Sequence, residues 1–311
     1  MAELSINETS LTNEYTQSAS MGTGVWKRFR RHPGAIFGIV VITILIVMAL
    51  LAPASPYNPE ASDITSRYES PSLRHIMGTD ALGRDLFTRV LYGGRVSLSV
   101  GLMVVAISII IGVPIGALAG YYGGALDAIL MRITDAFLSL PSFLVLILLS
   151  AILWEIEIPM LSGNSVLTIS LVIGVFSWTT FARLVRAAFL SIRETEFVAA
   201  SRALGGSDAR IMIRHILPNS IGPIIVEATL EFGYAIIEES GLSFLGFGIQ
   251  PPTPSWGNLL SNAQEYFMKY PWLAIFPGLM IFFSIISINY IGDGLRDAFD
   301  PNKVLNKVGE V

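Results

Sequence analysis

The stretch VSLSVGLMVVAISIIIGVPIGALA, residues 96–119, decides the fold class of this chain. It holds 24 residues without a charge, and an α-helix needs about 20 predominantly apolar residues to cross the hydrocarbon core of a bilayer. Pro114 inside the stretch does not exclude a helix, because neighbouring helices can satisfy the backbone groups that a proline frees. We therefore expect a transmembrane helix here.

Five further apolar stretches accompany this one. The composition agrees with them, since 52% of the 311 residues are hydrophobic and 14% are charged, whereas soluble domains carry about 25% charged residues. The sequence therefore predicts an all-α, polytopic membrane protein with six transmembrane helices. The other five are expected at roughly 35–52, 136–154 (interrupted by Pro141), 165–182, 220–240 and 272–291.

The basic residues predict the orientation of these spans. Residues 1–24 are polar and expected to be disordered, and a cluster of basic residues at 27–31 then directly precedes the first span. If the N-terminus is cytoplasmic, the cytoplasmic segments hold 14 of the 20 Lys and Arg residues, as the positive-inside rule favours. We expect both the N-terminal tail, residues 1–34, and the C-terminal tail, residues 292–311, in the cytoplasm.

The largest expected external segment covers residues 53–95. Between Asp80 and Arg95 its apolar residues recur at helical spacing, which predicts a short amphipathic helix along the membrane surface before the second span. This helix either packs on the ends of the spans or contacts substrate. The five spans that follow form a core over residues 96–291.

The sequence contains no motif for catalysis or cofactor binding. It has no cysteine, its three histidines lie far apart, and it lacks both the P-loop of ATP-binding proteins and the common hydrolase motifs. The net charge of −4 argues against nucleic acid as a partner. We therefore expect no catalytic residue, metal or cofactor in this chain, and lipid as its surroundings.

The segment between the expected fourth and fifth spans contains signals for two short helices. Ser191 and Glu194 form a possible capping box, and Gly205-Gly206 can end the first helix in the left-handed conformation. Ser207 can cap a second helix, which Pro218 would limit. Such a pair is either an ordinary structured loop or a docking surface for another protein.

The stretch EFVAASRALGGSDARIMIRHILPNS, residues 196–220, resembles the E-A-A-x-x-x-G-x9-I-x-L-P signature of permease subunits of ATP-binding-cassette importers. The sequence departs from the signature where Ala199 replaces the glutamate, Ser201 the second alanine and His215 the isoleucine. The resemblance implies a coupling segment, residues 191–218, that contacts ATPase subunits. Its expected coupling residues are Glu196, Ala199, Ala200, Ser201, Leu204, Gly205, His215, Leu217 and Pro218.

Three further stretches resemble one branch of these permeases, the C-type subunit of dipeptide and oligopeptide importers. They are HIMGTDALGRDLFTRVLYGGRVSLSVG (75–101), GLSFLGFGIQPPTPSWGNLL (241–260) and NYIGDGLRDAFDP (289–301). The resemblance implies a type I importer permease fold in a bacterial inner membrane. It also implies four partners: a second, non-identical permease, two ATPase subunits that hold ATP and magnesium, and an extracytoplasmic substrate-binding protein.

Two questions about function stay open at this point. Importers of nickel complexes and of glutathione share this branch, so the substrate is a peptide or one of these. An ion-driven secondary transporter is a further alternative, although it predicts internal repeats that are not evident in the sequence.

Four glutamates in the expected fifth span are costly in a membrane helix. Glu227, Glu231 and Glu238 share roughly one helical face, which predicts that they line the translocation pathway or the interface with the partner permease. Glu239 belongs to the same candidate set. A proton relay is the alternative for this acidic face.

Overall fold

The computed structural model describes residues 21–156 and 164–299. Within these ranges the regular elements are helices, and the only β-bridge is an isolated one between Thr79 and Asp85. Five helices are long and apolar enough to cross a membrane, and a sixth span results if one bent helix pair counts as a single span. The predicted all-helical, polytopic class is therefore confirmed.

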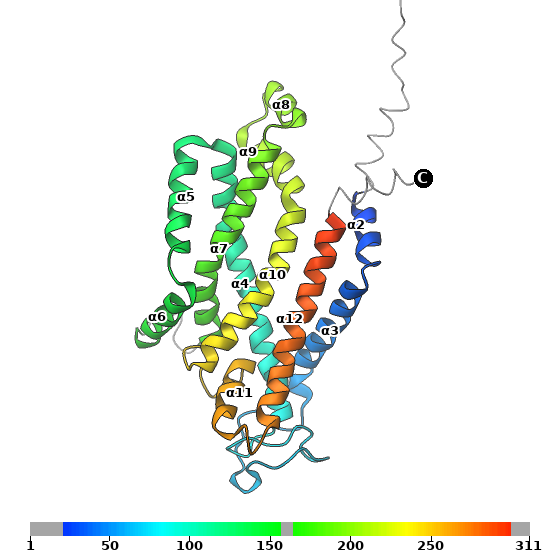
Figure 1. The fold of residues 1–311 in the computed structure, drawn as a ribbon, viewed down its shortest axis with the longest axis vertical. Helices are drawn as coiled ribbons and strands as arrows, with labels where there is room; N and C mark the ends of the chain where they lie inside the picture. Colours follow the sequence, from blue (N-terminus) through cyan, green and yellow to red (C-terminus); the bar gives the residue numbers. More distant parts are fainter. Residues whose placement is uncertain (1–20, 157–163, 300–311) are drawn as a thin grey trace, which may run out of the picture.

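The five long helices stand side by side (Figure 1). They are α3 (Pro33–Leu50), α4 (Leu86–Tyr122), α7 (Ser165–Ile192), α10 (Leu217–Phe244) and α12 (Trp272–Phe299). The bent pair consists of α5 (Gly124–Leu138) and α6 (Ser142–Glu155), which meet at 83°. Shorter helices are α2 (Met21–Phe29), α8 (Glu196–Ala203), α9 (Asp208–Ile211) and α11 (Trp256–Ala263).

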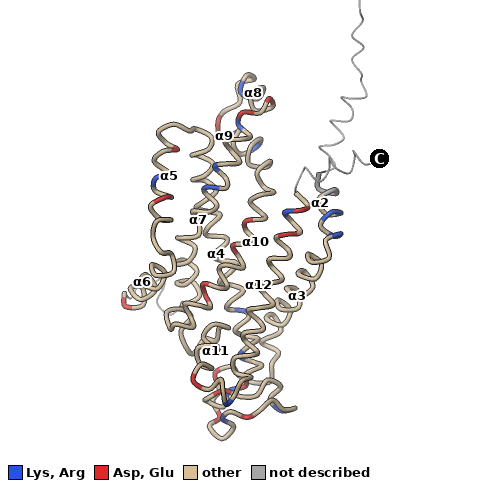
Figure 2. The backbone as a smooth tube through the Cα atoms, viewed as in Figure 1, with Lys and Arg blue, Asp and Glu red and all other residues tan. Residues whose placement is uncertain are grey.

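The two ends of the bundle differ. The α8 end carries α8 and α9, whereas the α11 end carries α11 and residues 52–85 (Figure 1). Charged residues gather at the α11 end and around α8 and α9, and acidic residues also follow the middle of the bundle (Figure 2). The charged ends suit a molecule whose ends lie in water, whereas acidic residues in the middle must face the protein interior, a cavity or a partner.

Helices α4 and α7 make the most extensive contact in the bundle. Gly112, Gly116 and Gly120, spaced four residues apart, face the backbone of α7. A Cβ atom on Gly116 would lie 2.4 Å from the carbonyl oxygen of Ala182, and one on Gly112 would lie 2.4 Å from that of Trp178. Small residues at this spacing allow helices in membranes to approach closely, and we call these three residues the glycine seam.

The first span packs against the last. Pro33 begins α3, and the Nδ1 atom of His32 accepts a hydrogen bond from the Ala35 backbone N–H at 3.1 Å, which caps the helix. Further along, a Cβ atom on Gly38 would lie 2.4 Å from the carbonyl oxygen of Ser287 in α12. Both termini of the described chain therefore belong to one side of the bundle.

Three expectations about element boundaries need correction. No separate amphipathic helix lies in the 53–95 segment, because α4 begins at Leu86 and continues without a break into the second span. The C-terminal tail starts later than residue 292, since α12 extends to Phe299. The expected disorder up to about residue 24 ends earlier, because α2 begins at Met21 and its Phe29 packs against α12. The remainder of both tails lies outside the described residues.

The third span also begins earlier than expected. Its break at Pro141 is confirmed, but the helix that runs beside α7 is α5, which carries three charged residues. Two of these are paired, because Asp127 accepts two hydrogen bonds from Arg186 at 2.5 and 2.6 Å and Asp135 accepts one from Arg183 at 2.6 Å. Such pairing lowers the cost of charges on a helix in the membrane.

Candidate functional site

The 191–218 segment contains two short helices around a glycine turn. Gly205, at the end of α8, has a φ of +81°, a conformation that glycine adopts without steric cost. The Gly205 N–H bonds to the Arg202 carbonyl and the Gly206 N–H to the Ser201 carbonyl, each at 3.0 Å. These two bonds form a Schellman motif, so the expected glycine elbow is confirmed.

The start of α8 differs from the expectation. Helix α7 runs past Ser191 to Ile192, so the proposed capping box of Ser191 and Glu194 does not form. Thr195 is the N-cap instead, and its hydroxyl donates to the Ile192 carbonyl at 2.6 Å rather than accepting from α8. The capping box does not form because the backbone hydrogen bonds of α7 continue through Ser191. The spacing of Ser191 and Glu194 alone does not reveal this.

The second helix also behaves differently at its far end. Ser207 is the N-cap of α9, but its side chain makes no capping bond. Pro218 does not end the helix, because a π-helical turn at Met212–Ile216 connects α9 to α10, and Pro218 lies in the first turn of α10. Pro218 therefore lies within one continuous helix, where its missing N–H removes a backbone hydrogen bond, and the π-helical turn directly before it departs from regular α-helical bonding. Helix α9 is thus a direct extension of the fifth span.

A small apolar cluster holds α8 and α9 to the bundle. Val198 of α8 and Ile211 of α9 are fully buried with Phe189 of α7 and Tyr121 of α4. The Tyr121 hydroxyl donates to Asp208 at 2.7 Å, and Arg202 approaches it at 3.5 Å. This last contact raises the pKa of the Arg202 guanidinium, which stays charged.

Arg193 links the ends of two spans below this cluster. Its guanidinium donates to the carbonyls of Gly120 and Tyr121 at 3.0 and 3.3 Å, the last turn of α4. A cation at a helix C-terminus also complements the helix dipole. Movement of α8 and α9 is therefore connected to α4, α7 and α10.

The outer face of α8 is apolar and open. Leu204 is 90% exposed, Phe197 is 46% exposed, and the small residues Ala199 and Ala200 between them are exposed too. Large apolar side chains that share one exposed face make this face a candidate contact surface. We call Phe197, Ala199, Ala200 and Leu204 the α8 face.

The remaining expected coupling residues lie outside this face. Glu196 starts α8 and is exposed, whereas Ser201 is half-buried and accepts the glycine-turn bond. His215 and Leu217 are half-buried at the π-helical turn, away from the α8 face, and His215 accepts a bond from Asn219 through its carbonyl. The positions of His215 and Leu217 suit residues that stabilise the junction between α9 and α10.

The acidic face of α10 borders a cavity of about 270 Å³. Glu231, Tyr234 and Glu238 line it from α10, and Phe137 and Phe176 line it from α5 and α7. Glu231 is only 6% exposed, and its Oε1 atom has no hydrogen-bond partner among the described residues. Glu227 is on the same helix one turn away, outside the lining set.

Glu239 occupies a different environment from the other three. It is fully buried and accepts hydrogen bonds from Ser97 of α4 at 2.8 Å and from Ser243 at 2.7 Å. The Ser97 hydroxyl in turn accepts a hydrogen bond from the backbone N–H of Trp256 at the start of α11. Glu239 therefore ties α10, α4 and α11 together, and sequence spacing alone did not separate this role from the cavity face.

The stretches 75–101 and 241–260 meet at the α11 end. The Trp256 indole N–H donates to the Val90 carbonyl at 3.0 Å, and its ring lies against Gly93 and Gly94. Ser255 and Asn258 form a capping box at the start of α11. In the sequence these stretches stand out only by their resemblance to a family, whereas the structure shows that they pack against each other.

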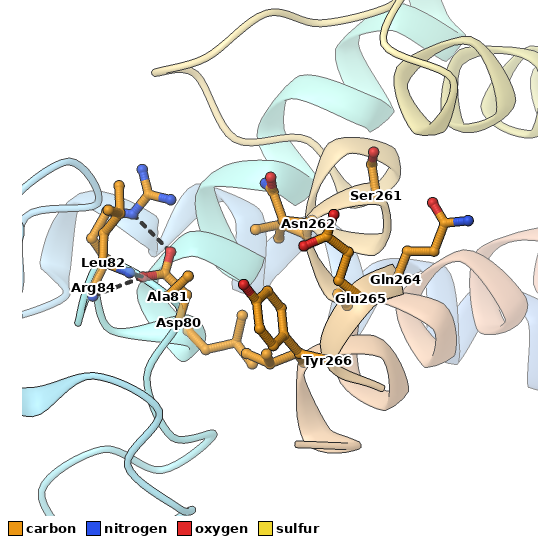
Figure 3. Close-up of a pocket in the computed structure, with 13 residues that line it drawn as sticks. Asp80, Ala81, Leu82, Arg84, Ser261, Asn262, Gln264, Glu265 and Tyr266 are labelled. Carbon is orange, nitrogen blue, oxygen red and sulfur yellow. Dashed lines mark hydrogen bonds and ion pairs between the residues drawn. The ribbon is translucent and has the colours of Figure 1, made fainter. Parts of the chain in front are cut away.

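The loop before α4 is folded around buried polar contacts. Asp85 caps α4 by accepting from Thr88 and bonds to His75 at 2.8 Å. Asp80 accepts from Arg84 at 2.7 Å, and both line an open pocket of about 410 Å³ with Glu265 and Tyr266 (Figure 3). The α11 end thus presents a shaped, polar surface.

Comparison with known proteins identifies the family. Residues 112–304 match the family of binding-protein-dependent transport system inner membrane components. The chain belongs to this family. Residues 20–71 also match the N-terminal transmembrane domain of oligopeptide transport permease C.

Curated relatives resemble this permease over nearly its whole length. It is 41% identical to a dipeptide transport system permease protein of Alkalihalophilus pseudofirmus, over 93% of this chain and 92% of the relative. It is 42% identical to a putative peptide permease protein of Brucella suis, over 90% of each. The resemblance to the peptide-importer branch is therefore confirmed.

A solved structure shares the fold of this permease. A chain of the MetNI methionine ABC transporter in an inward-facing conformation superposes with a TM-score of 0.55 at 19% identity, covering 69% of this chain and 98% of the other. The permease is a multi-pass inner membrane protein and a non-catalytic subunit of its transport system. Membership of the family implies ATPase and binding-protein partners.

Proposed function

We propose that this permease imports dipeptides or oligopeptides, forming half of a translocation pathway and receiving force through the α8 face. The observation that carries the proposal is the pairing of an exposed apolar face on α8 with a rigid connection to three spans. A partner that moves the α8 face displaces these spans together, because packed helices shift as rigid bodies.

The peptide substrate rests on the relatives. Both curated relatives described above carry names that refer to dipeptide or peptide transport, and the cavity beside Glu231 offers carboxylates for a charged substrate. Selection among peptides belongs to the binding protein, which would dock at the α11 end.

The partners follow from unsatisfied surfaces. The side of α10 that carries the half-buried Glu227 and Glu238 beside the exposed Tyr234 cannot face lipid cheaply, so a second, non-identical permease covers it. Two ATPase subunits, which hold ATP and magnesium, contact the two permeases at their α8 faces. Both termini of this chain then lie in the cytoplasm with α8.

Cysteine cross-linking tests the α8 face directly. The chain has no cysteine of its own, so Leu204→Cys introduces a single thiol at the C-cap of α8, where the native side chain is 90% exposed. We expect it to cross-link to an ATPase subunit carrying one cysteine in the surface next to the permease. Met268→Cys, 93% exposed at the α11 end, is the matched control and should give no such product. Equal cross-linking of both variants, or of neither, contradicts the proposal.

A further inference from the structure

The wall of the cavity between α5, α7 and α10 contains a hydrogen-bond acceptor that has no donor among the described residues. Glu231 is more than nine-tenths buried, yet its Oε1 atom has no hydrogen-bond partner among the described residues. A buried polar atom without a hydrogen-bond partner is unfavourable. Such an atom in a cavity wall indicates a group that arrives from outside the chain.

Beside Glu231, the only charged side chain among the described lining residues is another carboxylate, and the uncharged polar ones are the hydroxyls of Ser142, Ser177, Thr179, Thr180 and Tyr234. Glu238 lies two turns further along α10, about 10 Å away along the helix axis, and no Lys or Arg is among the described lining residues. A positively charged ligand group is therefore favoured over an anionic or a neutral one.

Aromatic rings complete the surroundings. Phe137 and Phe176 line the cavity with their ring centroids 5.3 Å apart, and Tyr234 lies on α10 between the two glutamates. Ring faces attract organic cations. A bare metal ion is disfavoured, because two carboxylates on one helix, without a third ligating side chain among the described residues, do not form a metal shell.

We propose that this cavity binds a primary ammonium group of the transported peptide, with Glu231 as its direct acceptor and Glu238 at the entrance. The ammonium belongs either to the peptide N-terminus or to a lysine side chain. The inference rests on the proposed function, since it assigns a substrate contact to the pathway. Tyr234 is 60% exposed in the single chain, which leaves the cavity open toward the partner permease.

The test measures peptide binding to the assembled permease and ATPase complex in nanodiscs without the binding protein, so that only the membrane subunits select. Saturation-transfer NMR compares three probes: dialanine, N-acetyl-dialanine and N-acetyl-lysyl-alanine. We expect N-acetyl-dialanine to bind about tenfold more weakly than the better of the other two, which corresponds to about 1.4 kcal/mol. Preference for dialanine supports the N-terminus, and preference for N-acetyl-lysyl-alanine supports the lysine side chain.

The variants locate the contact. Glu231→Gln should remove the preference for an ammonium, whereas Glu227→Gln, one turn away and outside the cavity, should keep it. ATPase activity of each complex verifies assembly, and Glu238→Gln at the entrance replaces Glu231→Gln if that variant fails to assemble. Equal binding of all three probes, no binding of any, or full preference in the cavity variants overturns the inference. The proposed function fails separately, if the wild-type complex shows no ATP-dependent peptide uptake.

Discussion

At the scale of single residues, two positions carry most of the argument. Gly205 is the residue at which the chain reverses between α8 and α9, and its φ of +81° is the reason for a glycine. Glu231 is the acceptor without a partner. Ala199 is exposed on α8 where the importer signature has a glutamate, so we expect shape to contribute more than charge at this surface.

Gly205→Val should uncouple ATP hydrolysis from uptake while the protein still inserts in the membrane. A residue with a Cβ atom costs about 1–2 kcal/mol in the left-handed region, and a β-branched residue tolerates this region least. The turn would therefore adopt another backbone conformation, which would move the α8 face. The readout is peptide uptake per ATP hydrolysed in proteoliposomes.

Gly205→Asn is the matched control, because asparagine tolerates the left-handed conformation and no atom lies within 4 Å of a Cβ atom built at this position. It should stay coupled. Normal uptake by the valine variant would mean that the turn geometry is not needed.

At the scale of elements, the seam between α4 and α7 fixes the core. The glycine seam brings the two backbones together, and Arg193 joins their ends. The paired charges of α5 attach the bent third span to the same helix, α7. The α8 face is therefore connected to a rigid unit rather than to a loose loop.

Gly116→Ala should lower the thermal unfolding midpoint of the purified permease and reduce its amount in the membrane. The added Cβ would lie 2.4 Å from the Ala182 carbonyl, and overpacking of this kind costs about 1–3 kcal/mol. Gly278→Ala makes the same change in α12, where the nearest atom is 3.9 Å away, and should be neutral. Equal midpoints for the two variants would contradict the seam.

Sequence predicted the spans well because their length and apolarity are local properties. It missed the glycine seam, since the need for glycine at residue 116 depends on where α7 lies. It placed the third span too late, because Asp127 and Asp135 look unfavourable until their arginine partners on α7 are known. The glycine turn was predictable, whereas the capping box was not, since α7 continues past Ser191.

The same limit applies to the candidate site. Helical spacing placed Glu231 and Glu238 on one face, and the structure brings both to one cavity. It could not separate Glu239, whose serine partner on α4 is 142 positions away in sequence. Long-range hydrogen bonds of this kind follow from the fold and not from local pattern.

At the scale of the whole molecule, the two ends of the bundle have different tasks in the proposal. The α8 end meets the ATPases, and the α11 end, with its folded loop and open pocket, meets the binding protein. The cavity beside Glu231 lies between them. This arrangement requires that the two ends lie on opposite sides of the membrane.

Thiol labelling in intact cells tests this orientation. A membrane-impermeant reagent should label Met268→Cys from outside and should leave Leu204→Cys unlabelled until the cells are opened. Both positions are at least 90% exposed, so a difference in labelling reports sidedness rather than burial. Labelling of Leu204→Cys in intact cells would reverse the proposed topology.

The most direct test of the central claim is peptide uptake by proteoliposomes that contain this permease. With the partner permease, the ATPases and the binding protein present, uptake should require ATP hydrolysis and should stop when any one of them is left out. Uptake by this chain alone, driven by an ion gradient without ATP, would contradict the account.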